Sequence, residues 1–141
     1  KPENVLLPRR EGSDVKLTDF GMARMRDQDP GRDHAPLGIT AAYASPEQAL
    51  GGPAGERSDL YTCGLILYEM LCGRHPFDAN VPVAFLFQHV HRQVPPPSRF
   101  VDGLAPDLEE LVVSLLSKAP ERRPSSAREV LATLRQLRAP R

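Results

Sequence analysis

Apolar and polar residues follow two different repeats along this chain. Short apolar runs at 5–7 and 15–18 flank a connector rich in turn-forming residues, a pattern that predicts a β-hairpin. Later in the chain, apolar residues recur instead with the spacing of helices. The expected helices span 58–72, 82–92, 107–118 and 126–138. We therefore expect an α+β fold that is mostly α, with one hairpin followed by helices.

The segment between the hairpin and the first helix follows neither repeat. Residues 22–44 contain two glycines and two prolines, which favour turns over regular structure. A loop of this length is uncommon in a compact domain and is usually functional. We expect a long functional loop here.

The expected helix at 58–72 is apolar on nearly every face, which is typical of a buried helix. Ser58 or Asp59 can cap its start, and Gly73 follows its end. The remaining helices offer too little surface to cover it. We therefore expect missing material upstream, and we expect the chain expressed alone to aggregate or partly unfold.

The last expected helix carries a clear start signal and an apolar stripe. Ser126 and Glu129 have the spacing of a capping box, in which each side chain bonds to the other's backbone. The apolar positions that follow on one face are Val130, Leu131, Leu134 and Leu137. This stripe predicts that the helix packs on the rest of the domain.

Composition narrows the functional classes. The 141 residues carry no net charge, which argues against a nucleic-acid binder. Cys63 and Cys72 fall on opposite faces of one expected helix and cannot pair with each other. With no signal-peptide pattern and no apolar run of membrane-spanning length, we expect a cytoplasmic protein, anchored if at all by residues outside this chain.

Candidate catalytic or metal-binding residues stand just before the first strand and just after the second strand of the expected hairpin. Asp19-Phe20-Gly21 follows the second strand, and a carboxylate followed by glycine there suits Mg²⁺, which prefers oxygen ligands. Asn4 precedes the first strand, so the hairpin could bring its amide oxygen near Asp19. Taken alone, such a tripeptide is far more often a solvated turn.

Three motifs in order carry a resemblance to a known family. They are Lys1-Pro2-Glu3-Asn4, Asp19-Phe20-Gly21 and Ser45-Pro46-Glu47. They resemble the end of the catalytic loop, the DFG motif and the APE-type motif of protein kinases. Segments 57–61 and 120–124 also resemble that family. The resemblance implies a protein-kinase-like C-terminal lobe over 1–138, with a long activation loop, and 139–141 as a tail or linker.

The resemblance implies roles for individual residues near the phosphates. Asp19 and Asn4 would bind the Mg²⁺ ions that bridge the phosphates of ATP. Lys1 would contact the γ-phosphate, and Thr40 would lie beside the catalytic aspartate. Residues 40–46 would support the backbone of the substrate.

The resemblance also implies structural roles. Phe20 would pack toward the other lobe and report the active or inactive state, with Gly21 giving the backbone freedom beside it. Glu47 and Arg123 would form a structural ion pair, because a buried carboxylate needs a partner. Asp59 would brace the backbone of the catalytic loop.

The function implied is that of a serine/threonine protein kinase, of a kind similar to bacterial ones, which phosphorylates protein substrates with ATP and Mg²⁺. The Gly-rich loop, the phosphate-orienting lysine and the catalytic aspartate, which would stand two residues before Lys1, are absent from this sequence. We expect the chain alone to be inactive. The alternative is a pseudokinase or truncated lobe that only binds partners, and an aspartate encoded at that upstream position would favour the enzyme.

The expected activation loop lacks the usual switch residues. Residues 22–39 contain no serine, threonine or tyrosine. We therefore hypothesise that the intact kinase is not activated by phosphorylation within this stretch.

Overall fold

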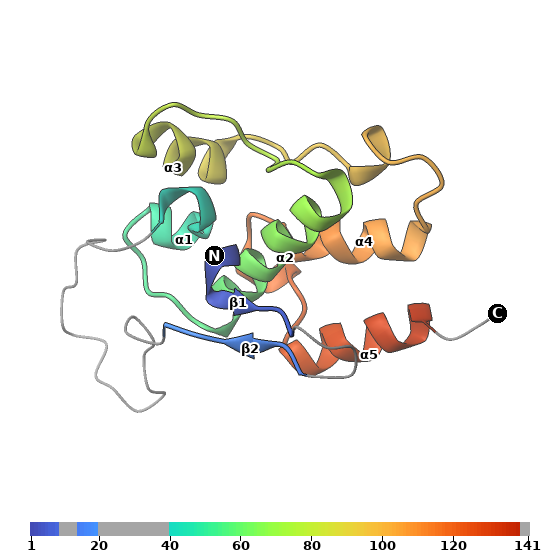
Figure 1. The fold of residues 1–141 in the computed structure, drawn as a ribbon. Helices are drawn as coiled ribbons and strands as arrows, with labels where there is room; N and C mark the ends of the chain where they lie inside the picture. The colour runs from blue at the N-terminus through green and yellow to red at the C-terminus, as the bar shows by residue number, and fades with distance from the viewer. Residues whose placement is uncertain (9–13, 20–39, 139–141) are drawn as a thin grey trace.

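The computed structural model describes residues 1–8, 14–19 and 40–138. The segment 20–39, which includes Phe20, Gly21 and most of the expected activation loop, lies outside the described residues. Within the described part, the chain begins as a hairpin and continues as helices, which agrees with the expected α+β, mostly α architecture (Figure 1).

The hairpin forms where the sequence predicts it, but its strands are shorter. Strands β1 (Val5–Leu6) and β2 (Lys16–Leu17) are antiparallel, with Val5 opposite Leu17 and Leu6 opposite Lys16. Leu6 and Leu17 are 48% and 62% exposed. A two-stranded ribbon that buries so little apolar surface gains little stability from further strand pairing, which explains the short strands.

Among the described residues, helices occupy the four expected segments, and five short helical elements accompany them. The single turn η1 (Pro2–Asn4) precedes β1, and a second turn, η3 (Ala41–Tyr43), leads into the short helix α1 (Pro46–Ala49). The later elements are α2 (Glu56–Cys72), α3 (Pro82–His91), η4 (Pro97–Arg99), α4 (Pro106–Leu115), η5 (Pro120–Arg122) and α5 (Ala127–Arg138).

Helix α2 begins two residues before the expected start. Gly55 is the N-cap, and its backbone N–H donates to Oγ of Ser58 at 3.1 Å, so Ser58 stands inside the first turn and does not cap the helix. At the other end, Gly73 adopts a φ of 66° and its N–H donates to the carbonyl of Glu69. A side chain at Gly73 would be strained in that conformation, so glycine ends the helix.

The core lies between α2 and α4 (Figure 1). Tyr61, Leu65 and Tyr68 of α2 pack against Val112 of α4 and the adjacent Leu116, all at most 3% exposed. A second cluster joins Leu60, Leu111 and Leu115. The other side of α2 is open, since Cys63 is exposed and Met70 is 76% exposed.

Helix α5 forms half of its expected capping box. Ser126 Oγ accepts a hydrogen bond from the Glu129 N–H at 3.3 Å, as expected. The Glu129 carboxylate, however, accepts from the N–H and hydroxyl of Ser125, both at 2.7 Å. The neighbouring serine offers two donors where Ser126 would offer one, which explains the different partner. Only part of the apolar stripe is covered, since Leu131 and Leu134 stay exposed.

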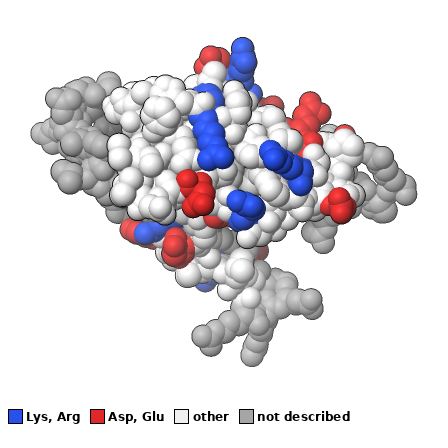
Figure 2. Space-filling model, turned by 90° about the horizontal axis from the view of Figure 1, so that it is seen from above, with Lys and Arg blue, Asp and Glu red and all other residues white. Residues whose placement is uncertain are grey.

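The surface shows no large field of one sign on the face seen in Figure 2, where acidic and basic side chains are interspersed. None of the helices formed by the described residues has the length and hydropathy needed to cross a membrane. Cys63 and Cys72 are both free thiols.

Gly64 on α2 is the closest approach between the two central helices. A Cβ built there would lie 2.8 Å from Cβ of Leu115 on α4. We expect Gly64→Ala to separate the helices at an overpacking cost of about 1–3 kcal/mol, which exceeds the gain of about 1 kcal/mol from alanine's helix propensity. Denaturant unfolding of the full-length protein measures the loss.

Gly55→Ala is the matched control, because a Cβ there meets no atom within 4 Å. Its expected cost is below about 1 kcal/mol and arises from the weaker N-cap alone. Equal stability of the Gly64→Ala and wild-type proteins would contradict the close contact between α2 and α4.

Candidate functional site

The hairpin brings Asn4 and Asp19 to the same end. The backbone N–H of Thr18 donates to the Asn4 carbonyl at 2.9 Å, so the pairing of β1 and β2 continues through these two residues. Asp19 follows directly, with an exposed side chain and a φ of 61°. Residues with a side chain rarely adopt that left-handed conformation, although aspartate does so more often than most. The backbone at the carboxylate is therefore in an uncommon conformation.

Asn4 and Asp19 offer oxygen ligands of the kind that Mg²⁺ prefers. No side-chain hydrogen bond joins them within the described residues. No cluster of three or more His, Cys, Asp or Glu suited to a metal occurs in 1–8, 14–19 or 40–138. Two oxygens fit Mg²⁺ better than ions that need a complete protein cage, because Mg²⁺ keeps several waters.

Two further residues singled out by the sequence lie on the surface. Lys1 and Thr40 are both exposed, and Thr40 immediately precedes η3. The turn η1 lies near η3. Burial, the nearby Glu69 and the charge of Glu3 all raise the pKa of Tyr43. The structure thus places the N-terminal segment on the same side as the loop at 40–46 (Figure 1). Asp59 is also exposed, in the first turn of α2.

Glu47 and Arg123, 76 positions apart, meet in a two-pronged ion pair. Nη1 of Arg123 lies 2.8 Å from Oε1 of Glu47, and Nη2 lies 2.8 Å from Oε2. The Arg123 side chain is fully buried and that of Glu47 is 18% exposed. Such a parallel arrangement is the strongest geometry for a guanidinium and a carboxylate.

Arg123 uses all of its remaining donors on backbone carbonyls. Nε donates to Ser117 at 2.8 Å, Nη1 also to Arg57 at 2.7 Å, and Nη2 also to Lys118 at 3.0 Å. The guanidinium lies 4.9 Å from the ring centre of Tyr61. A single buried cation therefore joins α1, the start of α2, and the segment after α4.

Ser58 completes the surroundings of Glu47, a contact that the sequence did not reveal. Its hydroxyl donates to Oε1 of Glu47 at 2.5 Å. Burial alone would raise the pKa of Glu47, but the hydrogen bonds from Arg123 and Ser58 outweigh it and lower the pKa to about 2. The polar residues at 58–59 suggested only a helix cap, because capping a helix and donating to Glu47 both need a small polar side chain.

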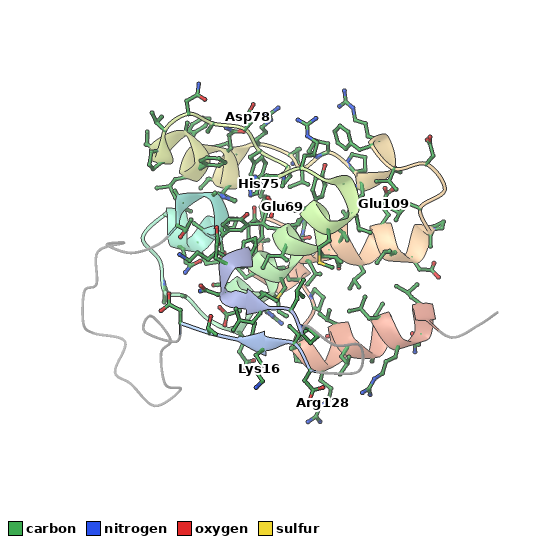
Figure 3. All side chains as sticks on the ribbon, viewed as in Figure 1. Lys16, Glu69, His75, Asp78, Glu109 and Arg128 are labelled. Atoms are coloured by element: carbon green, nitrogen blue, oxygen red, sulfur yellow. The ribbon has the colours of Figure 1, made fainter. Side chains whose placement is uncertain are left out.

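The loop at 40–46 is anchored by partly buried polar contacts to α2. The hydroxyl of Thr62 donates to the carbonyl of Tyr43 at 3.0 Å, and the Tyr43 hydroxyl donates to Glu69 at 2.9 Å. The loop then ends in a capping box, since Ser45 and Gln48 bond to each other's backbone at the start of α1. The ring of His75 stands edge-on to that of Tyr43, with ring centres 5.4 Å apart; Figure 3 labels both Glu69 and His75. Thr62 and Glu69 carry no motif by which the sequence could identify them.

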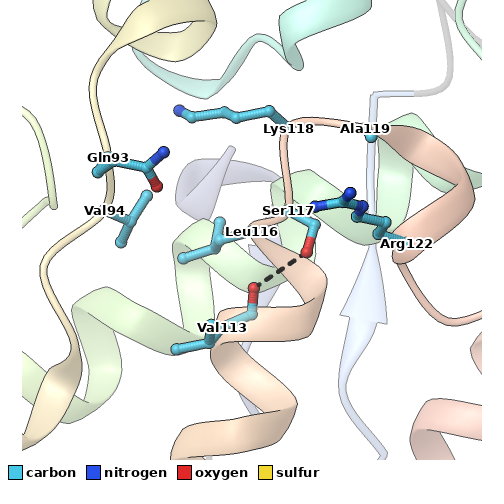
Figure 4. A pocket seen from close by; sticks show the side chains of 8 residues that line it. All are labelled: Gln93, Val94, Val113, Leu116, Ser117, Lys118, Ala119 and Arg122. Carbon is cyan, nitrogen blue, oxygen red and sulfur yellow. Dashed lines mark hydrogen bonds between the residues drawn. The ribbon is translucent and has the colours of Figure 1, made fainter.

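A pocket of about 260 Å³ opens between the chain after α3 and the end of α4 (Figure 4). It is lined by Gln93, Val94, Val113, Leu116, Ser117, Lys118, Ala119 and Arg122. None of these residues was singled out from the sequence as a site residue. The pocket is therefore separate from the groups at the hairpin and the loop.

Comparison with known proteins agrees with the motifs. Residues 1–134 match the family described as the protein kinase domain. The chain is 39% identical over 144 residues to a probable serine/threonine-protein kinase of Corynebacterium efficiens, which covers 97% of this chain and 21% of the relative. It is 41% identical over 142 residues to the serine/threonine-protein kinase pkn3 of Myxococcus xanthus, covering 95% and 26%.

A third relative is the serine/threonine-protein kinase PknB of Mycobacterium tuberculosis, 41% identical over 138 residues, with 95% of this chain and 21% of the relative covered. The chain thus spans roughly a fifth to a quarter of the length of these relatives.

Arg123→Lys tests the buried junction. A lysine ammonium has three donors and cannot replace the five that Arg123 uses, so carbonyls of the 117–118 turn and of Arg57 lose their partners. We expect the free energy of unfolding of the full-length protein to fall by about 3–5 kcal/mol. The matched control is Arg122→Lys, an exposed neighbour, with an expected change within about 0.5 kcal/mol. Similar losses for both variants would show that the junction contributes little.

The lowered pKa of Glu47 predicts a dependence of stability on pH. Because the folded pKa of about 2 lies below the ordinary glutamate value of 4.5, the stabilisation is complete above pH 4.5 and is lost as pH falls through about 2. The total amounts to about 3 kcal/mol. Urea unfolding between about pH 5 and 3 should show a shallower decline for Glu47→Gln than for wild type. The exposed Glu121→Gln control should keep the wild-type slope, and a wild-type slope in Glu47→Gln would rule out this origin.

Proposed function

The chain belongs to the protein kinase family, and we propose that residues 1–138 form the C-terminal lobe of a serine/threonine protein kinase. The complete enzyme transfers the γ-phosphate of ATP to serine or threonine residues of protein substrates. The proposal draws on the relatives, which are named serine/threonine-protein kinases, and on the arrangement of the three motifs in this chain.

The observation that carries the proposal is the common placement of Asn4 and Asp19 at one end of the hairpin. The bond from Thr18 to the Asn4 carbonyl sets the two residues one position apart across the strands. Their amide and carboxylate oxygens would hold Mg²⁺, which neutralises charge on the phosphates of ATP when it is bound. The left-handed backbone conformation of Asp19 supports this role, because strained conformations cluster at functional sites.

Lys1 and Thr40 would act on the phosphoryl group and the catalytic aspartate. The exposed ammonium of Lys1 is available to stabilise the negative charge that develops on the transferring phosphoryl group. The exposed hydroxyl of Thr40 stands at the edge of the anchored loop, where it would meet the catalytic aspartate contributed by residues before Lys1. Lys1 would stabilise the charge on the phosphoryl group and Thr40 would orient the catalytic aspartate. Positioning and charge stabilisation supply most of the catalysis in phosphoryl transfer.

The loop at 40–46 would support the peptide substrate. Tyr43 is fixed at its carbonyl and its hydroxyl, so the backbone of this short segment is held by α2. A rigid edge of this kind reduces the entropy that is lost when a peptide binds. The same proposal includes a cytoplasmic catalytic domain, because both cysteines are free thiols.

Asp19→Asn tests the proposed site. The variant keeps the shape of the side chain but removes the charge that attracts the metal, and we expect phosphotransfer to fall by at least about 100-fold. Transfer of labelled γ-phosphate to a protein substrate by the full-length protein measures this. Asp14→Asn is the matched control, since Asp14 is another exposed carboxylate of the hairpin, and it should keep wild-type activity.

Two results would contradict the proposal. One is wild-type activity in Asp19→Asn, and the other is a full-length wild-type protein with no phosphotransfer and no aspartate two residues before Lys1. The second result would favour a lobe that only binds partners.

A further inference from the structure

His89 of α3 is fully buried and uses both of its ring nitrogens. Nε2 lies 3.0 Å from the carbonyl oxygen of Ala42, and Nδ1 lies 3.0 Å from the hydroxyl of Tyr61. A carbonyl only accepts hydrogen bonds, so Nε2 must carry the proton. Nδ1 is then free to accept from the Tyr61 hydroxyl, and one neutral tautomer satisfies both partners.

The imidazole is held in this orientation by its neighbours. The ring of Phe77 stands edge-on with its centre 4.9 Å away, and the rings of Tyr61 and His75 lie at 5.6 and 6.2 Å. The backbone carbonyl of His89 accepts from the ammonium of Lys118 at 2.7 Å, which fixes this end of α3. The donor at Nε2 therefore has a defined direction.

The partner of this donor belongs to the segment that the proposed function assigns to the peptide. Ala42 lies in the middle of η3, between Ala41 and Tyr43, and its own methyl side chain makes no hydrogen bond that could hold the turn. Helix α2 fixes this turn only through Tyr43, by the bonds from Thr62 and to Glu69. Within the described residues, the Ala42 carbonyl has one side-chain partner, the imidazole that reaches it from α3.

We propose that His89 is a positioning residue for the peptide-binding loop, acting through the hydrogen bond from its Nε2 to the Ala42 carbonyl. This inference rests on the proposed function, because that function gives the loop its role. His89 itself does not touch the substrate. It fixes the loop from α3, so that the turn at 41–43 is bonded to two helices.

Loss of this donor leaves the partly buried Ala42 carbonyl without its side-chain partner, and the turn relaxes to recover one. Peptide binding then weakens while the hairpin that would bind ATP is unaffected. For His89→Phe in the full-length protein, we expect the KM for a peptide substrate to rise about tenfold, the size of one net hydrogen bond. The kcat and the KM for ATP should change by less than about twofold.

Tyr61→Phe is the matched control for general destabilisation. It removes one buried hydrogen bond of the same imidazole but leaves the bond to Ala42 in place. It should lower the melting temperature and leave the KM for the peptide unchanged. An equal rise in that KM for Tyr61→Phe and His89→Phe would overturn the proposal, as would an unchanged KM in His89→Phe.

Two amide variants, one with a longer and one with a shorter side chain, provide a second test should His89→Phe not fold. The His89→Gln side chain can place its NH₂ near the position of Nε2, whereas His89→Asn reaches only the position of Nδ1. The proposal expects a peptide KM near wild type for the glutamine variant and a raised one for the asparagine variant. The same KM in both would overturn it.

Amide hydrogen exchange separates this inference from the proposed function, because it needs no activity. Exchange at residues 41–44 should be faster in His89→Phe than in Tyr61→Phe. If the wild-type protein transfers no phosphate but this difference is present, the proposed function fails and the positioning contact stands. If the enzyme is active and the exchange rates are equal, only the positioning role is refuted.

Discussion

The arrangement of the lobe depends on one constraint, the burial of the Arg123 guanidinium. A cation removed from water is costly unless it is paired and its donors are satisfied. Arg123 meets that condition with one carboxylate and three backbone carbonyls contributed by separate segments. Those segments must therefore come together in one geometry, because any large displacement leaves a buried charge or carbonyl unpaired.

This junction sets the position of the proposed peptide site. Glu47, the partner of Arg123, stands in the first turn of α1, directly after the loop at 40–46. Ser58 links the same carboxylate to the first turn of α2, and α2 in turn fixes Tyr43 through Thr62 and Glu69. The loop is therefore fixed at its end by the ion pair and along its length by α2.

The sequence predicted the elements better than their polar contacts. The helical repeat placed α2 to α5 within a few residues, because each has an apolar face that must be buried. The pairing of Glu47 with Arg123 came from the family resemblance, since no local pattern relates positions 76 apart. His89 shows the remaining limit. A helical pattern can indicate that a histidine faces the core, but its partner is a backbone carbonyl, which every residue carries and which no residue type marks.

The two halves of the proposed site differ in how firmly the structure holds them. The loop at 40–46 is anchored by partly buried hydrogen bonds to α2 and α3, whereas the hairpin exposes both Leu6 and Leu17 and has two paired positions. Beyond that pairing, the Thr18 bond to the Asn4 carbonyl sets the distance between the two proposed metal ligands. A ligand that engages both Asn4 and Asp19 stabilises the paired hairpin in proportion to its own binding. A nucleotide and metal bound as proposed would thus contribute to the order of their own site, while the loop at 40–46 is already held by the ion pair and α2.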